Sequence, residues 1–503
     1  MDYISIFYLL MPCCVLAFLY KIGYYCFFKY QFRYWKSRGI PHEDPIIPFG
    51  NAKEIGDTKN LAHFTTELYN KYKRTDADIP FIGAYFGCSP WAIITDLELA
   101  KKILTTYFSN FSDRGLYYND VDDPLTANLF TLDFHHWDPL RSSSTPAFTP
   151  LRMRSIFSAI VPIARELCVC LDRELDNNES LSIREFLACL TTDIIGICVF
   201  GINCNSLNNP NAEFRNYGRK LFESPRHGVF IRRILDEYPR IARMLHIKKI
   251  PDDISAFFIR VIRETIEYRE RNGVQENDIM DLLISRKNER KQEIGEEKAF
   301  NELASLAFVF FQAGFDSSAS TLAFCLFELA KNKNIQTKAR ESINEHMHNE
   351  ELTYEMMEKM PYIDMVLKET LRKNPPASNM PRVCQNDFLV PGTNTVIEKG
   401  TKVIIPVYAI HHDPEIYPNP DTFDPDRFNS AEAMNNFLAF SKGRRDCIGK
   451  RFAMMQAKIG LIYLLKNFEF SLAETMPEEI PLMINNALLT PEYLHLNLTA
   501  IRP

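Results

Sequence analysis

Residues 440–449, "FSKGRRDCIG", hold a single cysteine, Cys447, among two glycines and two arginines. A cysteine in such a loop can be half of a disulfide, a zinc ligand, a catalytic nucleophile or the ligand of a larger cofactor. It can also have no chemical role. The loop by itself leaves these alternatives open.

The cysteine count argues against a disulfide scaffold. Twelve cysteines in 503 residues are sparse, and their closest spacings are the adjacent Cys13–Cys14 and the C-x-C of Cys168 and Cys170. No C-x-x-C pair suggests a zinc site. We therefore expect a reducing compartment with mostly free thiols.

Charge and motif content exclude several functions. The net charge is −6 and the pI is near 6.1, so nucleic acid is not an expected partner. The chain has no G-x-G-x-x-G, Walker loop, G-x-S-x-G or H-E-x-x-H. Any nicotinamide or flavin chemistry would therefore need a partner protein.

A second candidate site lies in the apolar stretch 300–332, which predicts one helix of roughly 50 Å through the core. Its middle reads "AGFDSS", where Asp316 and Ser317 could hold water beside the helix and small residues could let a flat group approach. The alternative is a structural helix whose serines bond back to carbonyls and whose aspartate meets a distant arginine. A transmembrane span is disfavoured by Gln312 and Asp316.

Charged side chains give weaker signals. Glu369 and Arg372 are three residues apart in "PYIDMVLKETLRKNPP", which places them on one helical face. Arg427, in "PDRF", could complete a three-member network if the chain folds back. Such a network would have a structural role, whereas an isolated solvated pair would contribute little.

Two further arginines could bind carboxylates in a partly dry pocket. Trp137 and Arg141 lie four residues apart, so on a helix they would project together, and Arg382 precedes a predicted hairpin. The guanidinium fork gives bidentate, charge-assisted bonds to carboxylates. Single arginines are more often solvated at the surface.

The elements that must position these residues are mostly helical. Helical periodicity is clear at 153–175, 254–272 and 449–466. Alternating runs at 80–95 and 387–408 predict small hairpins, the second with a Pro-Gly turn. The predicted fold class is therefore mainly α with small β-sheets.

The N-terminus predicts a membrane anchor. Residues 3–20 carry no charge, and apolar character continues to residue 28. A cleaved signal peptide is disfavoured, because the start is not positive and no small-residue cleavage site follows. We expect an anchor at 1–28, a basic, proline-rich hinge at 29–50 and a single body at 51–503 on the cytosolic side.

Taken in order, the motifs W-x-x-x-R, A-G-x-D-S-S, E-x-x-R, P-D-R-F and F-x-x-G-x-R-x-C-I-G resemble the cytochrome P450 family of haem-thiolate monooxygenases. The resemblance covers nearly the whole chain, including the anchor and hinge, and implies a cytochrome P450-like fold. The cysteine loop is highly specific, whereas E-x-x-R is not. The stretches "TTDIIGICVFGINCNSL" and "RFAMMQAKIGL" are most similar to the microsomal branch expanded in insects.

The resemblance implies a role for each candidate residue. Cys447 would be the axial ligand of the iron of haem b, and Phe440 would pack beneath the ring. The remaining family positions are the haem propionate contacts Arg445, Arg382, Arg141 and Trp137, the structural network Glu369, Arg372 and Arg427, and the proton-relaying acid–alcohol pair Asp316 and Ser317. Two positions depart from the family pattern, since Ser317 replaces a threonine and Ser441 a glycine.

The resemblance also implies the setting of the reaction. Electrons would come from NADPH through NADPH–cytochrome P450 reductase, with cytochrome b5 as a possible second donor, at the endoplasmic reticulum membrane. Lys442, Arg444, Lys450 and Arg451 flank the cysteine loop and could form a basic docking patch; the alternative is a generic solvated patch. The substrates would be O₂ and a small lipophilic molecule, either a xenobiotic or an endogenous hormone or lipid.

Two other functions are carried as alternatives. One is a haem-thiolate isomerase or dehydratase that acts on a peroxide, against which the acid–alcohol pair argues. The other is a haem-containing binder that sequesters lipophilic ligands without turnover.

Overall fold

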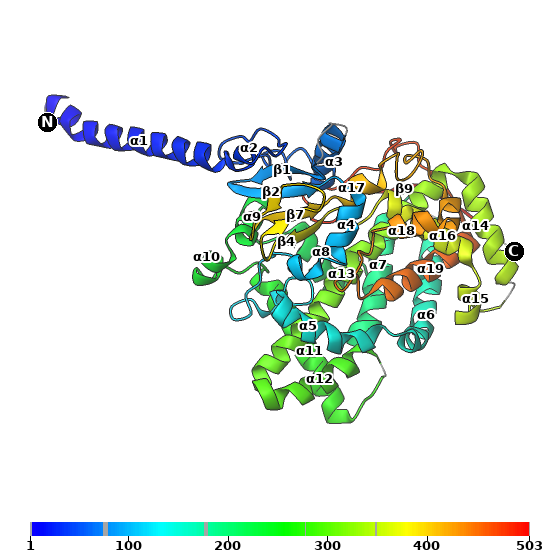
Figure 1. The fold of residues 1–503 in the computed structure, drawn as a ribbon. Coiled ribbons are helices and arrows are strands. Elements are labelled where there is room, and N and C mark those ends of the chain that lie inside the picture. The colour runs from blue at the N-terminus through cyan, green and yellow to red at the C-terminus, as the bar shows by residue number, and fades with distance from the viewer. Residues whose placement is uncertain (1–2, 74–78, 176–179, 277, 348–349, 502–503) are drawn as a thin grey trace.

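A computed structural model of the protein describes residues 3–73, 79–175, 180–276, 278–347 and 350–501 (Figure 1). Helices make up most of the body, and the largest sheet lies at the end nearer the N-terminal helix. The prediction of a mainly α fold with small sheets is therefore confirmed.

The α-helices of the described residues are α1 (Tyr3–Gln31), α2 (Tyr34–Ser37), α3 (Leu61–Lys73), α4 (Leu97–Leu104), α5 (Phe134–Ser144), α6 (Pro150–Leu175), α7 (Ile183–Ile195), α8 (Glu213–Glu223), α9 (Val229–Glu237), α10 (Pro239–Met244), α11 (Asp252–Asn272), α12 (Ile279–Ile294), α13 (Glu296–Lys331), α14 (Lys333–His346), α15 (Tyr354–Glu358), α16 (Pro361–Lys373), α17 (Val407–His411), α18 (Ala431–Asn436) and α19 (Lys450–Asn467). The helices predicted at 153–175, 254–272, 300–332 and 449–466 correspond to α6, α11, α13 and α19.

The 36-residue helix α13 is the axis of the core, as its apolar sequence predicts. It packs against α7, α12, α16 and α19, and almost all of its residues beyond the first turn are buried. Gln456 of α19 donates a hydrogen bond to Ser318 of α13 at 2.5 Å. This bond ties the helix that follows the cysteine loop to the central helix.

The largest sheet has four strands, in the order β1 (Phe81–Phe86), β2 (Ser89–Ile94), β7 (Lys402–Ile405) and β4 (Met380–Val383). The hairpin predicted at 80–95 is β1–β2. In the region 387–408, β5 (Phe388–Leu389) and β6 (Val396–Ile397) form a small hairpin, but β7 leaves it to pair with β2 in parallel and with β4 antiparallel. A third sheet has the order β3 (Leu181–Ser182), β9 (His495–Ala500) and β8 (Phe468–Leu472).

Helix α1 projects from the sheet end of the body (Figure 1). The predicted anchor begins with residues 1 and 2, which lie outside the described residues. Within the described part of the chain, no helix combines the length and the apolarity that membrane crossing requires. The N-terminal anchor is therefore not established by the fold.

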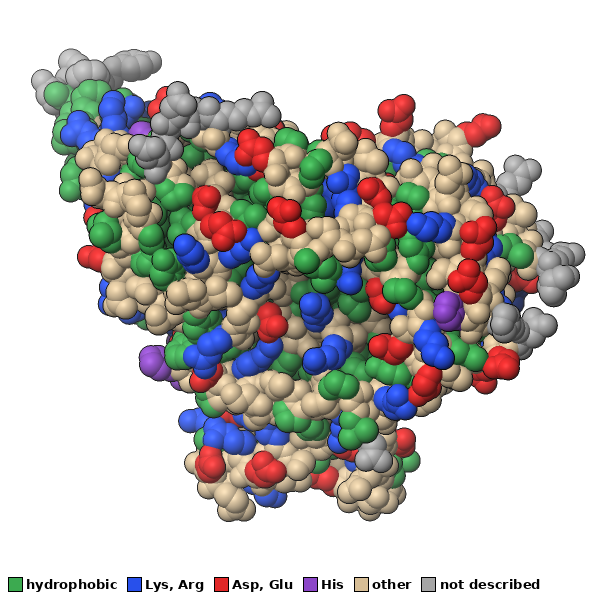
Figure 2. All heavy atoms as spheres, turned by 45° about the vertical axis from the view of Figure 1, so that its right-hand side comes forward, with side chains coloured by type: hydrophobic (Ala, Val, Ile, Leu, Met, Phe, Trp, Pro, Cys, Tyr) green, Lys and Arg blue, Asp and Glu red, His purple; other side chains and the backbone are tan. Residues whose placement is uncertain are grey.

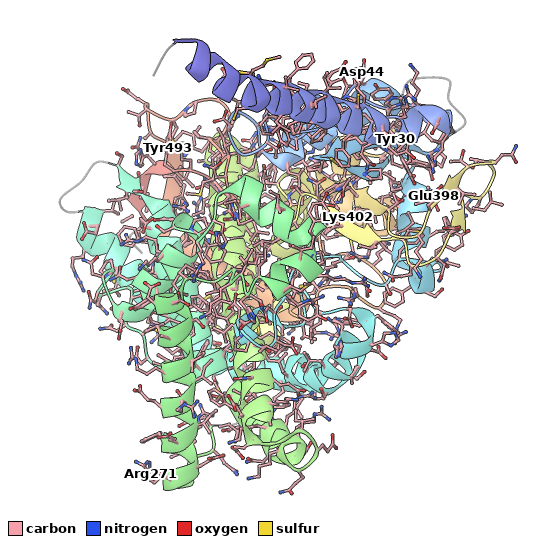
Figure 3. All side chains as sticks on the ribbon, turned by 90° about the vertical axis from the view of Figure 1, so that its left-hand side faces the viewer. Tyr30, Asp44, Arg271, Glu398, Lys402 and Tyr493 are labelled. Atoms are coloured by element: carbon pink, nitrogen blue, oxygen red, sulfur yellow. The ribbon has the colours of Figure 1, made fainter. Side chains whose placement is uncertain are left out.

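The segment predicted as a hinge is attached to the body. Helix α1 continues to Gln31, and Trp35 is fully buried, with its Nε1–H donating to the carbonyl of Ala84 at 3.0 Å. A Cβ atom at Gly83 would lie 2.4 Å from the Trp35 ring, so only glycine permits this packing. Figure 3 shows Tyr30 and Asp44 at this end of the molecule, while Arg271 marks the opposite end.

Charged side chains of both signs are interspersed over the face seen in Figure 2. Such a mixed surface agrees with the modest net charge of −6.

Candidate active site

The cysteine loop connects α18 to α19 and is shaped by two left-handed residues. Gly443 has φ +72°, and a Cβ atom there would lie 2.0 Å from the carbonyl oxygen of Leu104, so the position requires glycine. Ser441 adopts φ +63° although it carries a side chain, and its hydroxyl is buried with no hydrogen-bond partner among the described residues. A glycine would adopt this conformation without strain.

Within this loop Cys447 is an exposed residue, although protein atoms surround its thiol. The Cys447 N–H donates to the carbonyl of Phe440 at 2.9 Å, which closes the loop just before α19. Burial raises the pKa of the Cys447 thiol, whereas the Gly449 N–H and the nearby Arg141 and Arg114 lower it. The net direction is upward, so the thiol holds its proton, although the Gly449 amide and two cations lie where they would stabilise a thiolate.

Three guanidinium groups crowd together near the loop. Arg445 lies 4.3 Å above the ring of Trp137, and its Nη2 donates to the carbonyl of Leu132 at 2.9 Å. Its Nε and Nη1, and the Nε of Arg382, are buried without a hydrogen-bond partner among the described residues. Burial lowers the pKa of Arg445 to about 10, and burial together with Arg445 lowers that of Arg382 to about 9.

The third guanidinium belongs to Arg114, which sequence reasoning missed. Its Nη1 donates to the carbonyl of Phe130 at 2.9 Å, and burial together with Arg382 and Arg445 lowers its pKa well below the ordinary value. Nothing in the local sequence "SDRGLYY" distinguishes Arg114 from a surface arginine. Only the folding of its loop against the cysteine loop places it here.

Arg141 binds a residue of the cysteine loop, Asp446. Its guanidinium donates to the Asp446 carbonyl at 3.0 Å and to the Asp446 carboxylate at 2.7 Å. Trp137 and Arg141 both lie on α5, but the Trp137 ring stacks under Arg445 rather than beside Arg141. Arg445 is only weakly compensated, since the nearest Asp113 oxygen is 3.7 Å from its Nη2.

The polar residues in the middle of α13 lie on two different faces of the helix, with Ser317 on one and Asp316 on the other. Gly314 lies against α7, because a Cβ atom there would be 2.5 Å from Cδ1 of Ile195. Gly314 therefore allows α7 to approach the central helix closely. Ala313 is exposed and Ser317, one turn later, is half-buried, and the Ser317 hydroxyl donates to the Ala313 carbonyl at 2.6 Å.

Asp316 points away from Ser317, toward the chain near the C-terminus. The hydroxyl of Thr490 donates to its Oδ2 at 2.9 Å and the amide of Asn486 donates at 3.2 Å. Burial raises the pKa of Asp316, while Thr490, Asn486 and the charges of Arg184 and Arg215 lower it. The net direction is upward, so this carboxyl holds its proton more tightly than an exposed aspartate.

A small cavity of about 20 Å³ lies beside Asp316, between α7, α8 and α13. Arg215 lines it, donates to Glu185 at 2.8 Å, and has a buried Nη1 with no hydrogen-bond partner among the described residues. The cavity is large enough for about one water. Arg215 is another residue that sequence reasoning did not select.

Phe148 connects the cysteine loop to α13. Its ring lies 5.1 Å from that of Phe310 on α13, and 4.0 Å separates its Cε1 from a Cβ atom built at Gly449. Phe148 therefore lies between the end of the cysteine loop and the central helix.

The E-x-x-R pair of α16 is completely buried. Arg372 donates to both carboxylate oxygens of Glu369, and the Nε of Arg427 approaches Oε1 of Glu369 at 3.3 Å. The structure thus brings together all three members of the predicted network. The ring of Phe440 lies 6.3 Å from that of Phe437.

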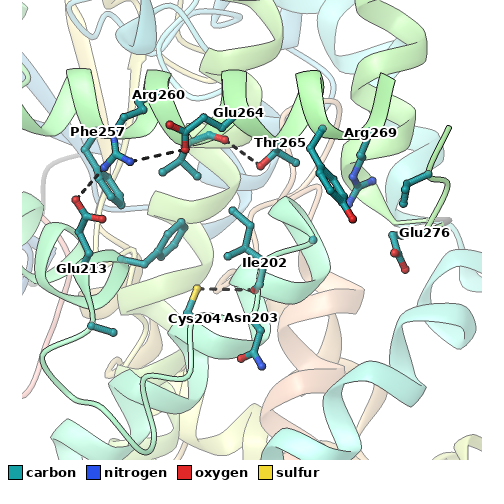
Figure 4. Close-up of a pocket in the computed structure, with 16 residues that line it drawn as sticks. Ile202, Asn203, Cys204, Glu213, Phe257, Arg260, Glu264, Thr265, Arg269 and Glu276 are labelled. Carbon is teal, nitrogen blue, oxygen red and sulfur yellow. Dashed lines mark hydrogen bonds and ion pairs between the residues drawn. The ribbon is translucent and has the colours of Figure 1, made fainter. Parts of the chain in front are cut away.

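Another cavity, of about 510 Å³, lies elsewhere (Figure 4). It is lined by residues such as Cys204, Phe257 and Arg260, from α11 and the segments before α8. None of the predicted site residues lines it.

Comparison with known proteins decides between the chemical alternatives for this loop. Residues 40–497 match the family model described as Cytochrome P450. The chain belongs to the cytochrome P450 family. It is 40% identical over 491 residues to "Cytochrome P450 6A1" of Musca domestica, covering 95% of both chains. It is also 41% identical over 468 residues to "Probable cytochrome P450 6a18" of Drosophila melanogaster, covering 91% of this chain and 92% of that one.

As a member of this insect branch of the family, the protein is a P450 monooxygenase, and the family implies a haem cofactor. The residues present fit such a group. Buried N–H donors of Arg382 and Arg445 lack partners among the described residues, and an anion with two carboxylates would satisfy them. The accessible thiol of Cys447 supplies the kind of sulfur donor that haem iron accepts.

Proposed function

We propose that this monooxygenase inserts one oxygen atom of O₂ into a small lipophilic substrate, and that the Cys447 thiolate would hold the iron of haem b. The observation that carries the proposal is the accessible Cys447 thiol beside the crowded guanidinium groups of Arg114, Arg382 and Arg445. Thiolate is the ligating form. Burial raises the pKa of this thiol, so iron binding would have to displace its proton, and the neighbouring cations would stabilise the thiolate that results. When bound, the haem supplies the redox-active iron at which oxygen is activated.

The arginines would hold the two haem propionates. Arg382 and Arg445 offer the unpartnered donors, while Trp137 stacks under Arg445 and fixes its plane. Arg141 would act mainly on the loop, because it is bonded to Asp446. Arg114 extends the predicted set.

Asp316 and Ser317 would deliver protons to the oxygen site. Ser317 is the accessible hydroxyl of α13, and Asp316 is the nearest acid along the helix. The bond from Ser317 to the Ala313 carbonyl lies beside that accessible face, where the hydroxyl can also accept from water. Asp316 would have to turn from Thr490 toward Ser317, or pass its proton through water.

The electrons would come from NADPH through a separate reductase, with cytochrome b5 as a second possible donor. Lys450 and Arg451 are exposed directly after the cysteine loop. Burial lowers the pKa of Lys442, and the nearby charges of Lys101 and Lys450 lower it further. Arg444 is less free, because it pairs with Asp138 at 2.5 Å. This basic patch would meet an acidic partner surface on the cysteine side of the protein.

The endoplasmic reticulum membrane is the proposed location. The side chains of α1 between Met11 and Tyr30 include a run of exposed large apolar residues, such as Leu16, Phe18 and Tyr20. Exposed apolar helices of this kind are stabilised by lipid. Substrates dissolved in the same membrane, whether xenobiotics or endogenous hormones or lipids, would then reach the body directly.

The test is the absorption spectrum of the reduced protein with carbon monoxide, recorded for wild type and Cys447→Ser. A strongly red-shifted Soret band that is lost in the variant supports thiolate ligation by Cys447. Persistence of that band in the variant would exclude Cys447 as ligand. Oxygen uptake linked to substrate, with added reductase and NADPH, then separates a monooxygenase from a peroxide isomerase or a passive binder.

A further inference from the structure

A buried histidine joins the ion-pair network to the cysteine loop. His411, the last residue of α17, is fully buried, and its ring stacks on Phe437 at 5.7 Å. Its Nδ1 lies 3.0 Å from the carbonyl oxygen of Arg372, and its Nε2 lies 3.0 Å from the backbone nitrogen of Leu438. The ring therefore spans the gap between α16 and the segment that leads into the loop.

The hydrogen-bond partners fix the form of the ring. The Leu438 N–H can only donate, so Nε2 must accept, and the Arg372 carbonyl can only accept, so Nδ1 must carry the proton. His411 is thus a neutral imidazole with one assigned tautomer. Burial and the charge of Arg372 lower its pKa to about 3, which keeps it neutral at physiological pH.

His411 and Arg372 each donate a hydrogen bond to the backbone carbonyl of the other. The carbonyl of His411 accepts a hydrogen bond from Nη1 of Arg372 at 2.9 Å, while the ring of His411 donates to the Arg372 carbonyl. That carbonyl belongs to the last turn of α16, where no helical N–H remains to satisfy it. The two residues hold each other independently of the carboxylate of Glu369.

Leu438 is in turn hydrogen-bonded to the loop that carries Cys447. The Leu438 carbonyl accepts from the Ser441 N–H at 2.8 Å, and the Phe440 carbonyl accepts from the Cys447 N–H at 2.9 Å. Leu438 is itself fully buried, so its N–H has no access to water if the imidazole is lost. An unsatisfied N–H at this point would displace the start of the loop.

We propose that His411 is a positioning residue that transmits the rigidity of the Glu369–Arg372 network to the Cys447 loop through its acceptor bond to Leu438. The inference rests on the proposed role of Cys447 as axial ligand. In this proposal the hydrogen bond accepted by Nε2 holds the loop in place, and neither the Nδ1 bond nor the packing of the ring would suffice.

Three substitutions separate these contributions. In His411→Gln the side-chain oxygen takes the place of Nε2 and can still accept from Leu438. In His411→Asn the side-chain nitrogen takes the place of Nδ1, so the Arg372 contact is kept and the Leu438 contact is lost. His411→Phe keeps only the ring, and His412→Gln is the matched control, because the His412 ring bonds to the Tyr408 carbonyl at 2.8 Å and not to the loop.

Two readouts on the full-length holoprotein test the proposal without measuring turnover. The first is the fraction of reduced, carbon-monoxide-bound protein with the red-shifted thiolate band. The second is hydrogen exchange of the Leu438 amide. We expect His411→Gln and His412→Gln to stay within about twofold of wild type, and His411→Asn and His411→Phe to speed exchange at Leu438 and reduce the thiolate fraction, each by about tenfold.

Each outcome has a distinct meaning. A thiolate fraction that is equal in His411→Gln and His411→Asn would overturn the inference while leaving Cys447 as ligand. Failure of all three His411 variants to retain the band, with unchanged exchange at Leu438, would also overturn it. A wild-type protein without the thiolate band would overturn the proposed function, and this inference with it.

Discussion

Arg372 and Glu369 form a two-point ion pair in which neither side chain is exposed to solvent. The Nε of Arg372 lies 2.8 Å from Oε2 of Glu369, and its Nη2 lies 2.9 Å from Oε1. Arg372 also donates to the carbonyls of His411 and Pro420, so its donors are nearly all used. Such a pair is a rigid support only while both charges are present.

Replacing Glu369 by glutamine should destabilise the fold strongly. The variant keeps the shape of the side chain but leaves the guanidinium of Arg372 buried without a counter-charge, at a cost of about 3–5 kcal/mol. Denaturant unfolding measures the change. Glu98→Gln, which removes the partner of Lys101 at the surface, should cost no more than about 0.5 kcal/mol, and equal effects would contradict the argument.

Asp316→Asn should stabilise the protein at neutral pH. Burial raises the pKa of this carboxyl in the folded state, so the folded chain binds its proton more tightly than the unfolded chain. Stability is therefore lost as the pH rises from the ordinary aspartate pKa through the raised one. The melting temperature of the variant should exceed that of wild type at pH 7, and the difference should shrink in acid.

Asp122→Asn provides a control of opposite sign. Hydrogen bonds from Asn119 and His246 lower the pKa of Asp122, so its charge stabilises the fold above the ordinary aspartate pKa. This variant should melt below wild type at pH 7 and approach it in acid. The same trend in both variants would refute the assignment for Asp316.

Ser317→Ala should uncouple electron consumption from product formation. The variant removes the accessible hydroxyl of α13 but leaves the helix intact, because the lost bond to the Ala313 carbonyl is local. We expect the peroxide released per NADPH consumed to rise several-fold. Ser317→Thr restores the hydroxyl with a more restrained rotamer and should couple at least as well as wild type. Unchanged coupling in the alanine variant would contradict a proton-relay role.

Ser441→Gly should stabilise the cysteine loop by about 1 kcal/mol. The substitution removes the left-handed strain at φ +63° and an unsatisfied buried hydroxyl. Thermal unfolding and the retention of the thiolate band on heating measure the effect. Asn419→Gly, at φ +51°, should gain less, because asparagine tolerates this conformation. A Ser441→Gly protein that is less stable than wild type would contradict the strain assigned here.

Neutralising the basic patch should weaken reductase binding. We expect Lys450→Gln with Arg451→Gln to raise the dissociation constant several-fold and to flatten its dependence on salt. The matched control is Arg271→Gln with Lys298→Gln, two exposed cations outside the patch. Arg271 lies at the far end of α11 (Figure 3). Equal effects of the two pairs would mean that only net charge matters.

The sequence predicted the local elements well. The helix expected at 153–175 spans Pro150–Leu175, and the hairpin at 80–95 pairs Phe81 with Ile94. The hydrogen bonds of a helix or a hairpin join residues that are close in the sequence, so a short window of sequence contains the periodicity and the turn residues that predict them. The sequence did not predict that β7 pairs outside the hairpin, because its partner β2 lies some 300 residues earlier.

By itself, the sequence determined the family and the candidate ligand Cys447, because the loop motif is contiguous and its residue types carry the chemistry. Only the tertiary structure decided what each charged group faces. Thr490 meets Asp316 across 174 residues, and Leu438 meets His411 across 27. Such contacts depend on how distant segments cross in the core, where a buried polar group takes whichever partner the packing brings within reach.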